Sequence, residues 1–308
     1  MDFEFEALFL LGAGASKPYG YPTGAELKDQ IIDQCINGGE LIEILTALGH
    51  YREDITSLGE QFRNASTTSI DAFLKNRNEF SSIGKAAISY FILEAERNIS
   101  KHFPNKEDWL GHLLGRVIEN KKKSFENRKL NFITFNYDRV LQFRLLKCVE
   151  SRFGLNSYQA AAIVRKYMIH HVYGSIANLP DLHEVNKLSL QMQTGQIIPH
   201  HCKLSSRNIK VMHEERQADE SEKIFDNPML DYFYKSNKIY ILGFGFDKDN
   251  MHTLGIDWSK VAGEVYVTAY DCGNAEIEQI KNLMLGCKNL TIEKWTCLEM
   301  LKENLVTL

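Results

Sequence analysis

The chain has 308 residues, enough for one large α/β domain or two modest domains. Its formal net charge of −4 at pH 7 excludes a general attraction to nucleic acid, so we expect no direct nucleic-acid partner. The acidic start MDFEFE does not fit a secretory signal, and no apolar run approaches membrane-spanning length. None of the six cysteines forms a C-x-x-C pair. We therefore expect a cytoplasmic protein with free thiols, no metal and no membrane partner.

The first predicted element is a buried strand at residues 7–11, where the sequence is short, continuous and apolar. Thr23 and Glu26 then have the spacing of a capping box, and apolar residues recur at helical spacing behind them. From about residue 40 to residue 127 only helical periodicity is present. We expect a helical insertion at 37–127 between the first strand and the rest of the sheet.

Further strands are expected at 130–135, 167–172, 208–213, 238–244 and 264–270. Helical stretches separate most of them, and this alternation predicts a parallel sheet covered by helices on both faces. The fold class is therefore α/β, with a Rossmann-like domain formed by residues 1–36 and 128–308. The weakly patterned segment 177–207 is expected to be a long loop over the site.

Small or polar residues follow each predicted strand except 208–213. These segments lie at 12–16, 136–138, 173–175, 243–247 and 271–274. Ligands of open parallel sheets bind beyond the carboxyl ends of the strands, so a ligand site is expected where these segments meet.

The glycine turn after the first strand has two interpretations. Its backbone N–H groups could approach a pyrophosphate, as glycine-rich strand-to-helix turns do. Lys17, however, occupies the third glycine position of the G-x-G-x-x-G fingerprint, and no GK[ST] sequence follows. A tight turn without a ligand explains the glycines equally well.

Asn136 and Asp138 follow the strand at 130–135. An asparagine side chain can orient a water molecule and a sugar hydroxyl together, because it both donates and accepts hydrogen bonds. Both residues could equally serve as turn or helix-capping residues. His170 and His171 lie on opposite sides of their strand, so only one of the two can face the site.

Together these segments resemble a known family. GAGASKPYGYP at 12–22 resembles the sirtuin opening G-A-G-x-S-x-x-x-G-x-P, TFNYD at 134–138 resembles T-Q-N-x-D, and HVYGSI at 171–176 resembles the H-G-S segment. With SIDAFL at 69–74 and GFGFDKDN at 243–250, the chain resembles the sirtuin-like domains of prokaryotic antiphage defence proteins. Members of that group are typically NAD-consuming enzymes.

The chain also departs from the sirtuin pattern. Phe135 replaces the glutamine of T-Q-N-x-D, and Tyr173 stands directly before Gly-Ser where a sirtuin has its catalytic histidine. His171 lies two residues earlier and therefore on the same face of the strand as Tyr173. The zinc module of sirtuins needs C-x-x-C pairs, which are missing. These departures favour NAD hydrolysis to nicotinamide and ADP-ribose over protein deacylation, with NAD as the substrate.

The resemblance implies a role for each segment. Asn136 would position water and a ribose hydroxyl, His171 would bind the ribose diol or accept a proton, and Asp138 would order the nicotinamide end. Other residues are expected to bind the dinucleotide: Gly12, Ala13, Gly14, Ser16, Gly174, Ser175, Gly243, Gly245, Asp271 and Cys272. Asp71 resembles a family position too, but its place at the start of a predicted helix favours a capping role.

Two other functions stay open, an NAD-dependent protein deacylase and a nucleotide sensor without turnover. The family implies depletion of NAD in defence, control by homo-oligomerisation, and partners such as an ATPase or an Argonaute-like protein. The helical block at 37–127 could be an assembly surface, or it could simply cover the sheet and form one wall of the site.

Overall fold

The computed structural model describes residues 5–102, 105–117, 129–177, 197–211 and 228–305. Its centre is a six-stranded, all-parallel sheet in the order β3-β2-β1-β4-β5-β6. The strands are β1 (Phe5–Leu11), β2 (Leu130–Thr134), β3 (Met168–His171), β4 (Ser236–Leu242), β5 (Glu264–Thr268) and β6 (Leu290–Glu293). This order confirms the predicted Rossmann-like α/β class.

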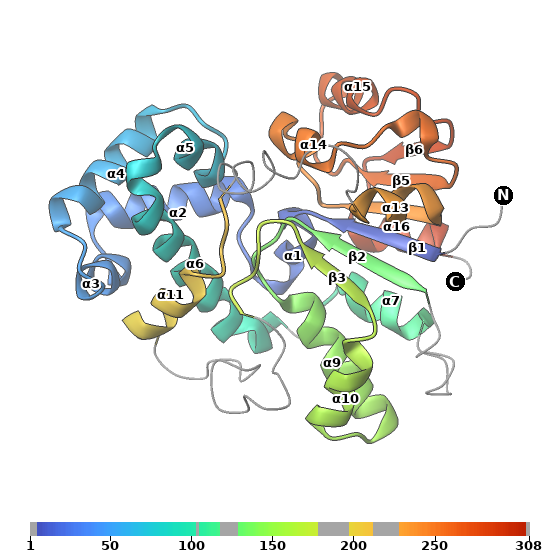
Figure 1. Cartoon of the computed structure of the whole chain (residues 1–308), viewed down its shortest axis with the longest axis horizontal. Helices are drawn as coiled ribbons and strands as arrows, with labels where there is room; N and C mark the ends of the chain where they lie inside the picture. Colours follow the sequence, from blue (N-terminus) through green and yellow to red (C-terminus); the bar gives the residue numbers. More distant parts are fainter. Residues whose placement is uncertain (1–4, 103–104, 118–128, 178–196, 212–227, 306–308) are drawn as a thin grey trace.

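The described elements between β1 and β2 are all helical. They are α1 (Ala13–Ser16), η1 (Lys17–Tyr19), α2 (Gly24–Asn37), α3 (Glu40–Ala47), α4 (Arg52–Asn64), α5 (Ile70–Asn76), η2 (Asn78–Phe80), α6 (Ser81–Asn98), η3 (Ile99–His102) and α7 (Trp109–Val117). Helices α2 to α6 gather beyond the carboxyl ends of the central strands (Figure 1). Since α2 packs against α4 as well as α3 and α6, the packing of this group begins before the predicted boundary at residue 37.

The remaining helices follow β2 in the chain. They are α9 (Val140–Phe153), α10 (Ser157–Val164), α11 (Pro199–Ser206), α13 (Pro228–Lys235), α14 (Lys248–Leu254), η4 (Trp258–Lys260), α15 (Asn274–Leu283) and α16 (Cys297–Asn304). Helix α7 packs against both α9 and α16, whereas α13 packs against β1 and β4.

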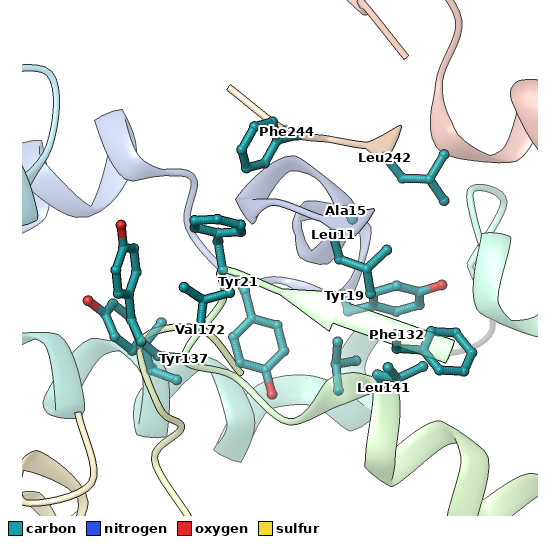
Figure 2. Close-up of a cluster of buried hydrophobic side chains, with 14 of the residues drawn as sticks. Leu11, Ala15, Tyr19, Tyr21, Phe132, Tyr137, Leu141, Val172, Leu242 and Phe244 are labelled. Atoms are coloured by element: carbon teal, nitrogen blue, oxygen red, sulfur yellow. The ribbon is translucent and has the colours of Figure 1, made fainter. Parts of the chain in front are cut away.

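Strand β1 lies at the centre of the core because it is paired on both sides and covered on both faces. Phe9 stacks between Phe132 and Tyr240, with ring centroids 5.1 Å away on each side. Toward the carboxyl ends of the strands, Leu11 and Leu242 belong to the buried cluster drawn in Figure 2. Continuous apolar runs are typical of strands buried on both faces.

Three sequence predictions need correction. The sequence 208–213 is not a sheet strand: Ile209 makes an isolated antiparallel bridge with Gly174, and residues 212–213 lie outside the described residues. The predicted loop 177–207 contains α11, while its part at 178–196 is not described. Strand β6 was missed because its four residues are all half-buried and show no alternation. The capping box is confirmed, since Glu26 N–H donates to Thr23 Oγ1 over 3.3 Å and Thr23 N–H donates back to Glu26 over 2.9 Å.

All six cysteines are free thiols, three of them buried and three partly exposed. Across the described ranges, no helix combines the length and the apolar character that a membrane span requires.

Candidate active site

A cavity of about 820 Å³ lies where the strand order reverses, at the carboxyl ends of β1 and β4. This switch point is where open α/β sheets bind their ligands, and the volume falls in the range of small-molecule sites. The lining residues come from the segments that follow β1, β2, β3 and β4 and from helices α2, α5, α6 and α15. The lining residues are Gly12, Ala13, Pro22, Gly24, Ala25, Leu27, Thr68, Ser69, Asp71, Ile92, Phe135, Asn136, Tyr137, Asp138, Tyr173, Phe244, Gly245, Phe246, Asp247, Lys248, Asp249, Asn250 and Gln279.

Asn136 is held in one orientation by three hydrogen bonds. Its side-chain Nδ2 donates to the carbonyl of Gly12 over 2.9 Å and to Ser16 Oγ over 3.0 Å. Its backbone N–H donates to Thr134 Oγ1 over 3.1 Å. Among the described residues Oδ1 has no hydrogen-bond partner, and Asn136 lines the cavity. The amide oxygen is therefore the acceptor that Asn136 offers to a ligand.

Asp138 is a buried carboxyl group on the same wall, 6% exposed. Its Oδ1 accepts the backbone N–H of Val140, the first residue of α9, over 3.0 Å, while the N-cap of α9 is Arg139. Burial raises its pKa from 3.8 to about 6, although a hydrogen bond with Ser16 acts in the opposite direction. At neutral pH the group is mostly ionised and can still accept a proton, which suits a general base.

Replacing Asp138 by Asn is expected to stabilise the protein at neutral pH. The raised pKa means that the folded state binds the proton more tightly than the unfolded chain, so ionisation costs stability as the pH rises from about 4 to about 6. Two pKa units correspond to about 3 kcal/mol. We expect Asp138→Asn to raise the free energy of unfolding at pH 7 by up to that amount and to match the wild type near pH 4, in denaturant titrations. A gain that is equal at both pH values would contradict the raised pKa.

A buried ion pair fixes the loop that carries Asn136 and Asp138. Arg139 donates to both carboxylate oxygens of Glu96 on α6, over 2.7 and 2.6 Å, and the two side chains are 3% and 0% exposed. Bidentate pairs of this kind have a defined geometry. This ion pair thereby connects the loop after β2 to helix α6.

Asp71 belongs to the cavity wall and is not the helix cap. Ser69 is the N-cap of α5, since its hydroxyl accepts the N–H of Ala72 over 3.2 Å. Asp71 instead accepts a short hydrogen bond from the hydroxyl of Tyr137, the residue between Asn136 and Asp138. Burial raises the pKa of Asp71. The sequence correctly predicts that Asp71 lies at the start of a helix, α5, but contains no signal for its contact with Tyr137 in the loop after β2.

Aromatic rings also line the cavity. Phe135 contacts Phe244 edge-on, with centroids 5.0 Å apart, and Tyr173 likewise at 5.4 Å. Phe246 packs on Phe244 at 5.2 Å and has a left-handed backbone with φ of +50°. Such a wall can pack against the planar ring of a ligand.

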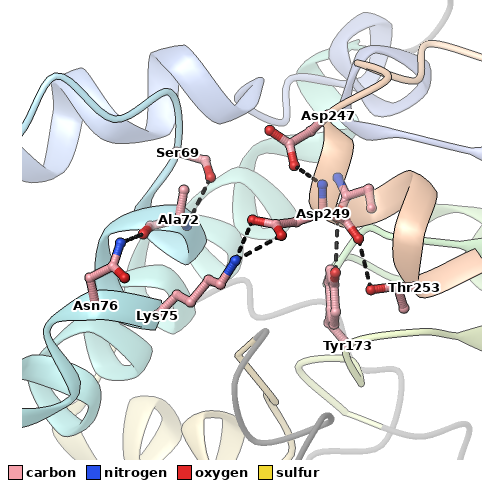
Figure 3. Close-up of polar contacts among 9 residues, drawn as sticks. Ser69, Ala72, Lys75, Asn76, Tyr173, Asp247, Asp249 and Thr253 are labelled. Atoms are coloured by element: carbon pink, nitrogen blue, oxygen red, sulfur yellow. Dashed lines mark hydrogen bonds and ion pairs between the residues drawn. The ribbon is translucent and has the colours of Figure 1, made fainter. Parts of the chain in front are cut away.

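Polar contacts join the helical group to the sheet beside the cavity (Figure 3). Lys75 on α5 pairs with both carboxylate oxygens of Asp249 on α14, over 2.7 and 2.8 Å. Tyr173 OH donates to Asn250 Oδ1 over 2.8 Å. Asp247 caps α14 by accepting the N–H of Asp249 over 2.8 Å. Asp247 and Asp249 lie in the segment 243–250 but are not among the site residues predicted from the sequence.

Two of the backbone donors predicted in the glycine turn are engaged within the protein. Gly12 N–H donates to Leu242 O and Gly14 N–H donates to Gly243 O, each over 3.0 Å. These amides are therefore unavailable to a pyrophosphate. Gly12 and Ala13 still line the cavity, and Ser16 holds Asn136. The glycines of the turn are required by close packing: a Cβ on Gly12 would lie 2.5 Å from Gly243 O.

His171, which the resemblance assigns to the ribose, contacts the backbone carbonyl of Asn136 and lies outside the cavity lining. Gly174 and Ser175 lie outside it too. Gly174 has φ of +73° and bridges to Ile209, which explains the glycine by backbone geometry. Ser175 Oγ donates to the carbonyl of Ala177 over 2.9 Å. Of these three residues, His171 supports the site through its contact with Asn136.

Of the other residues predicted to bind the dinucleotide, some line the cavity and others do not. Gly245 lines the cavity, whereas Gly243 packs against the turn after β1. Asp271 and Cys272 follow β5 at the same edge of the sheet but are not part of the lining. Within the described ranges no group of three His, Cys, Asp or Glu residues could hold a metal ion.

No protein-family model matches the chain, and no curated protein sequence matches it significantly. A functional assignment therefore depends on the geometry of this cavity and on the motifs in the chain itself.

Proposed function

We propose that the protein is an NAD hydrolase that cleaves the bond between nicotinamide and ribose. One observation carries the proposal: the fixed amide of Asn136 and the buried carboxyl of Asp138 line one cavity at the switch point of a 3-2-1-4-5-6 sheet. Sheets with this strand order bind dinucleotides at that crevice.

In the proposed reaction the bond between ribose C1′ and the nicotinamide nitrogen breaks, and its electron pair leaves with neutral nicotinamide. Positive charge develops on the ribose ring. The oxygen of a water molecule then bonds to C1′, and the water loses one proton. The products are nicotinamide, ADP-ribose and a proton, so no other reactant is needed.

Two oxygen atoms of the cavity suit this chemistry. The ionised Asp138 stabilises the developing positive charge and accepts the proton from water. Asn136 Oδ1 accepts a hydrogen bond from that water or from a ribose hydroxyl. Because the donors of Asn136 are already engaged, its oxygen needs no reorganisation during the reaction.

The rest of the lining bears on how a dinucleotide would lie. The rings of Phe135, Phe244 and Phe246 can pack against the nicotinamide or adenine ring. Lys248, exposed at the cavity, can pair with the pyrophosphate in place of the engaged glycine amides. The proposed antiphage role and partner proteins follow from the family resemblance alone.

Incubating the purified protein with NAD and no peptide tests the proposal. We expect nicotinamide and ADP-ribose in equal amounts, measured by chromatography over a range of protein concentrations so that self-assembly is covered. Release of nicotinamide only after addition of an acetyl-lysine peptide would favour the deacylase instead. Binding of NAD in calorimetry without product would favour the sensor.

A further inference from the structure

A partly buried chain of hydrogen bonds leads from α9 through β3 to Asn136. Gln142 Nε2 lies 2.5 Å from His171 Nε2, and His171 Nδ1 lies 2.8 Å from the backbone carbonyl of Asn136. His171 pairs with Thr134 in the sheet, two residues before Asn136. The imidazole thus sits between a helix and the strand-end loop, and both of its nitrogens are occupied.

The partners determine the protonation of His171. A carbonyl oxygen can only accept, so Nδ1 must carry the hydrogen, and Nε2 of the neutral ring then accepts from the amide of Gln142. Burial lowers the pKa of His171 to about 4, the hydrogen bond to the carbonyl of Asn136 acts in the opposite direction, and His170 adds to the lowering. The ring is therefore neutral at physiological pH, with neither nitrogen directed to a ligand.

We infer that His171 and Gln142 are positioning residues that act on the reaction only through Asn136. The Nδ1–H bond fixes the carbonyl of Asn136, and the side chain of the same residue bridges Gly12 and Ser16. The kinetic part of this inference rests on the proposed NAD hydrolysis. It differs from the role that the family resemblance implies, in which the histidine contacts ribose.

The environment of Gln142 supports this role. Its side chain is 8% exposed, and its Oε1 is a buried atom without a hydrogen-bond partner among the described residues. The neighbouring Leu141 and Leu145 on α9 are buried leucines. An apolar residue would avoid the cost of an unsatisfied amide oxygen at this position. The hydrogen bond from Gln142 Nε2 to His171 explains why a glutamine occupies this position.

A substitution series separates positioning from direct catalysis. His171→Leu removes the bond to Asn136, and we expect kcat to fall about 100-fold with KM within about 2-fold of wild type. His171→Asn keeps an N–H donor near the place of Nδ1, and we expect it to recover kcat to within about 10-fold of wild type. Gln142→Leu is expected to lower kcat by about 10-fold. His170→Leu, on the other side of β3, is the matched control and should keep wild-type activity.

If His171→Asn is as inactive as His171→Leu, the imidazole acts on the substrate directly and the inference fails. A second measurement needs no turnover. The ring ¹⁵N shifts of His171 should show the neutral Nδ1–H tautomer from pH 5.5 to pH 8, and a tautomer protonated at Nε2, or titration near pH 6.5, would overturn the inference. An inactive wild type with the expected tautomer would reject only the proposed function.

Discussion

Replacing Asn136 by Ala is expected to lower kcat for NAD cleavage by about 10³-fold. The substitution removes Oδ1, the acceptor available to water or ribose, and oriented groups of this kind contribute about 10²–10³ in rate. It also removes one of the two donors to the carbonyl of Gly12, which keeps the N–H of Ala15, and the donor to the hydroxyl of Ser16. We expect that loss to reduce the free energy of unfolding by about 1–3 kcal/mol. Nicotinamide release and denaturant unfolding, measured on the same preparation, separate the two effects.

Asn131→Ala is the matched control. Asn131 is a buried asparagine of β2, the strand that precedes Asn136; it is 6% exposed and lies outside the cavity lining. Its Nδ2 has no hydrogen-bond partner among the described residues, so truncation should leave kcat at the wild-type value. Turnover retained in Asn136→Ala, or an equal loss in Asn131→Ala, would remove Asn136 from the reaction.

The largest effect on stability is expected from Gly243→Ala. Gly243 has φ of +58°, and a Cβ there would lie 2.1 Å from the backbone nitrogen of Ala15 and 2.4 Å from the carbonyl carbon of Gly14. Both atoms belong to the backbone, so the turn after β1 and the segment after β4 must separate. We expect a loss of about 3 kcal/mol in the free energy of unfolding, from the clash together with the left-handed conformation.

Gly245→Ala provides the comparison two residues further on. A Cβ on Gly245 would meet no atom within 4 Å, and its backbone is not left-handed. Its free energy of unfolding should change by less than about 0.5 kcal/mol. Unfolding of the two variants at the same denaturant concentration would show that the contact between the two segments does not hold the switch point together.

Hydrophobic patterning predicted most of the fold. The runs that became β1, β2, β4 and β5 are mostly apolar, because each of these strands is paired on both sides and largely buried. Strand β6 lies at the edge of the sheet, half-buried, and lacks that signal. The segment at Ile209 resembles a strand by composition, but its single antiparallel bridge depends on the turn at Gly174, which comes from a different part of the chain.

Part of the site could be predicted as well. Asn136 and Asp138 follow a strand directly, so their place at the carboxyl edge follows from parallel topology. The contact between Asp71 and Tyr137 joins residues 66 positions apart, and local sequence rules contain nothing about it. The glycine turn shows the same limit: its sequence fits a phosphate loop, whereas the amides of Gly12 and Gly14 are engaged by carbonyls at the end of β4, more than 200 residues later.

The most direct test of the proposed site is a crystal structure with an NAD analogue whose nicotinamide ribose oxygen is replaced by a methylene group, which resists cleavage. We expect the dinucleotide to cross the sheet edge between β1 and β4, with the nicotinamide ribose beside Asn136 Oδ1 and the Asp138 carboxylate. Density for the analogue away from this cavity, or with its adenine in place of the ribose at Asn136, would contradict the proposed active site.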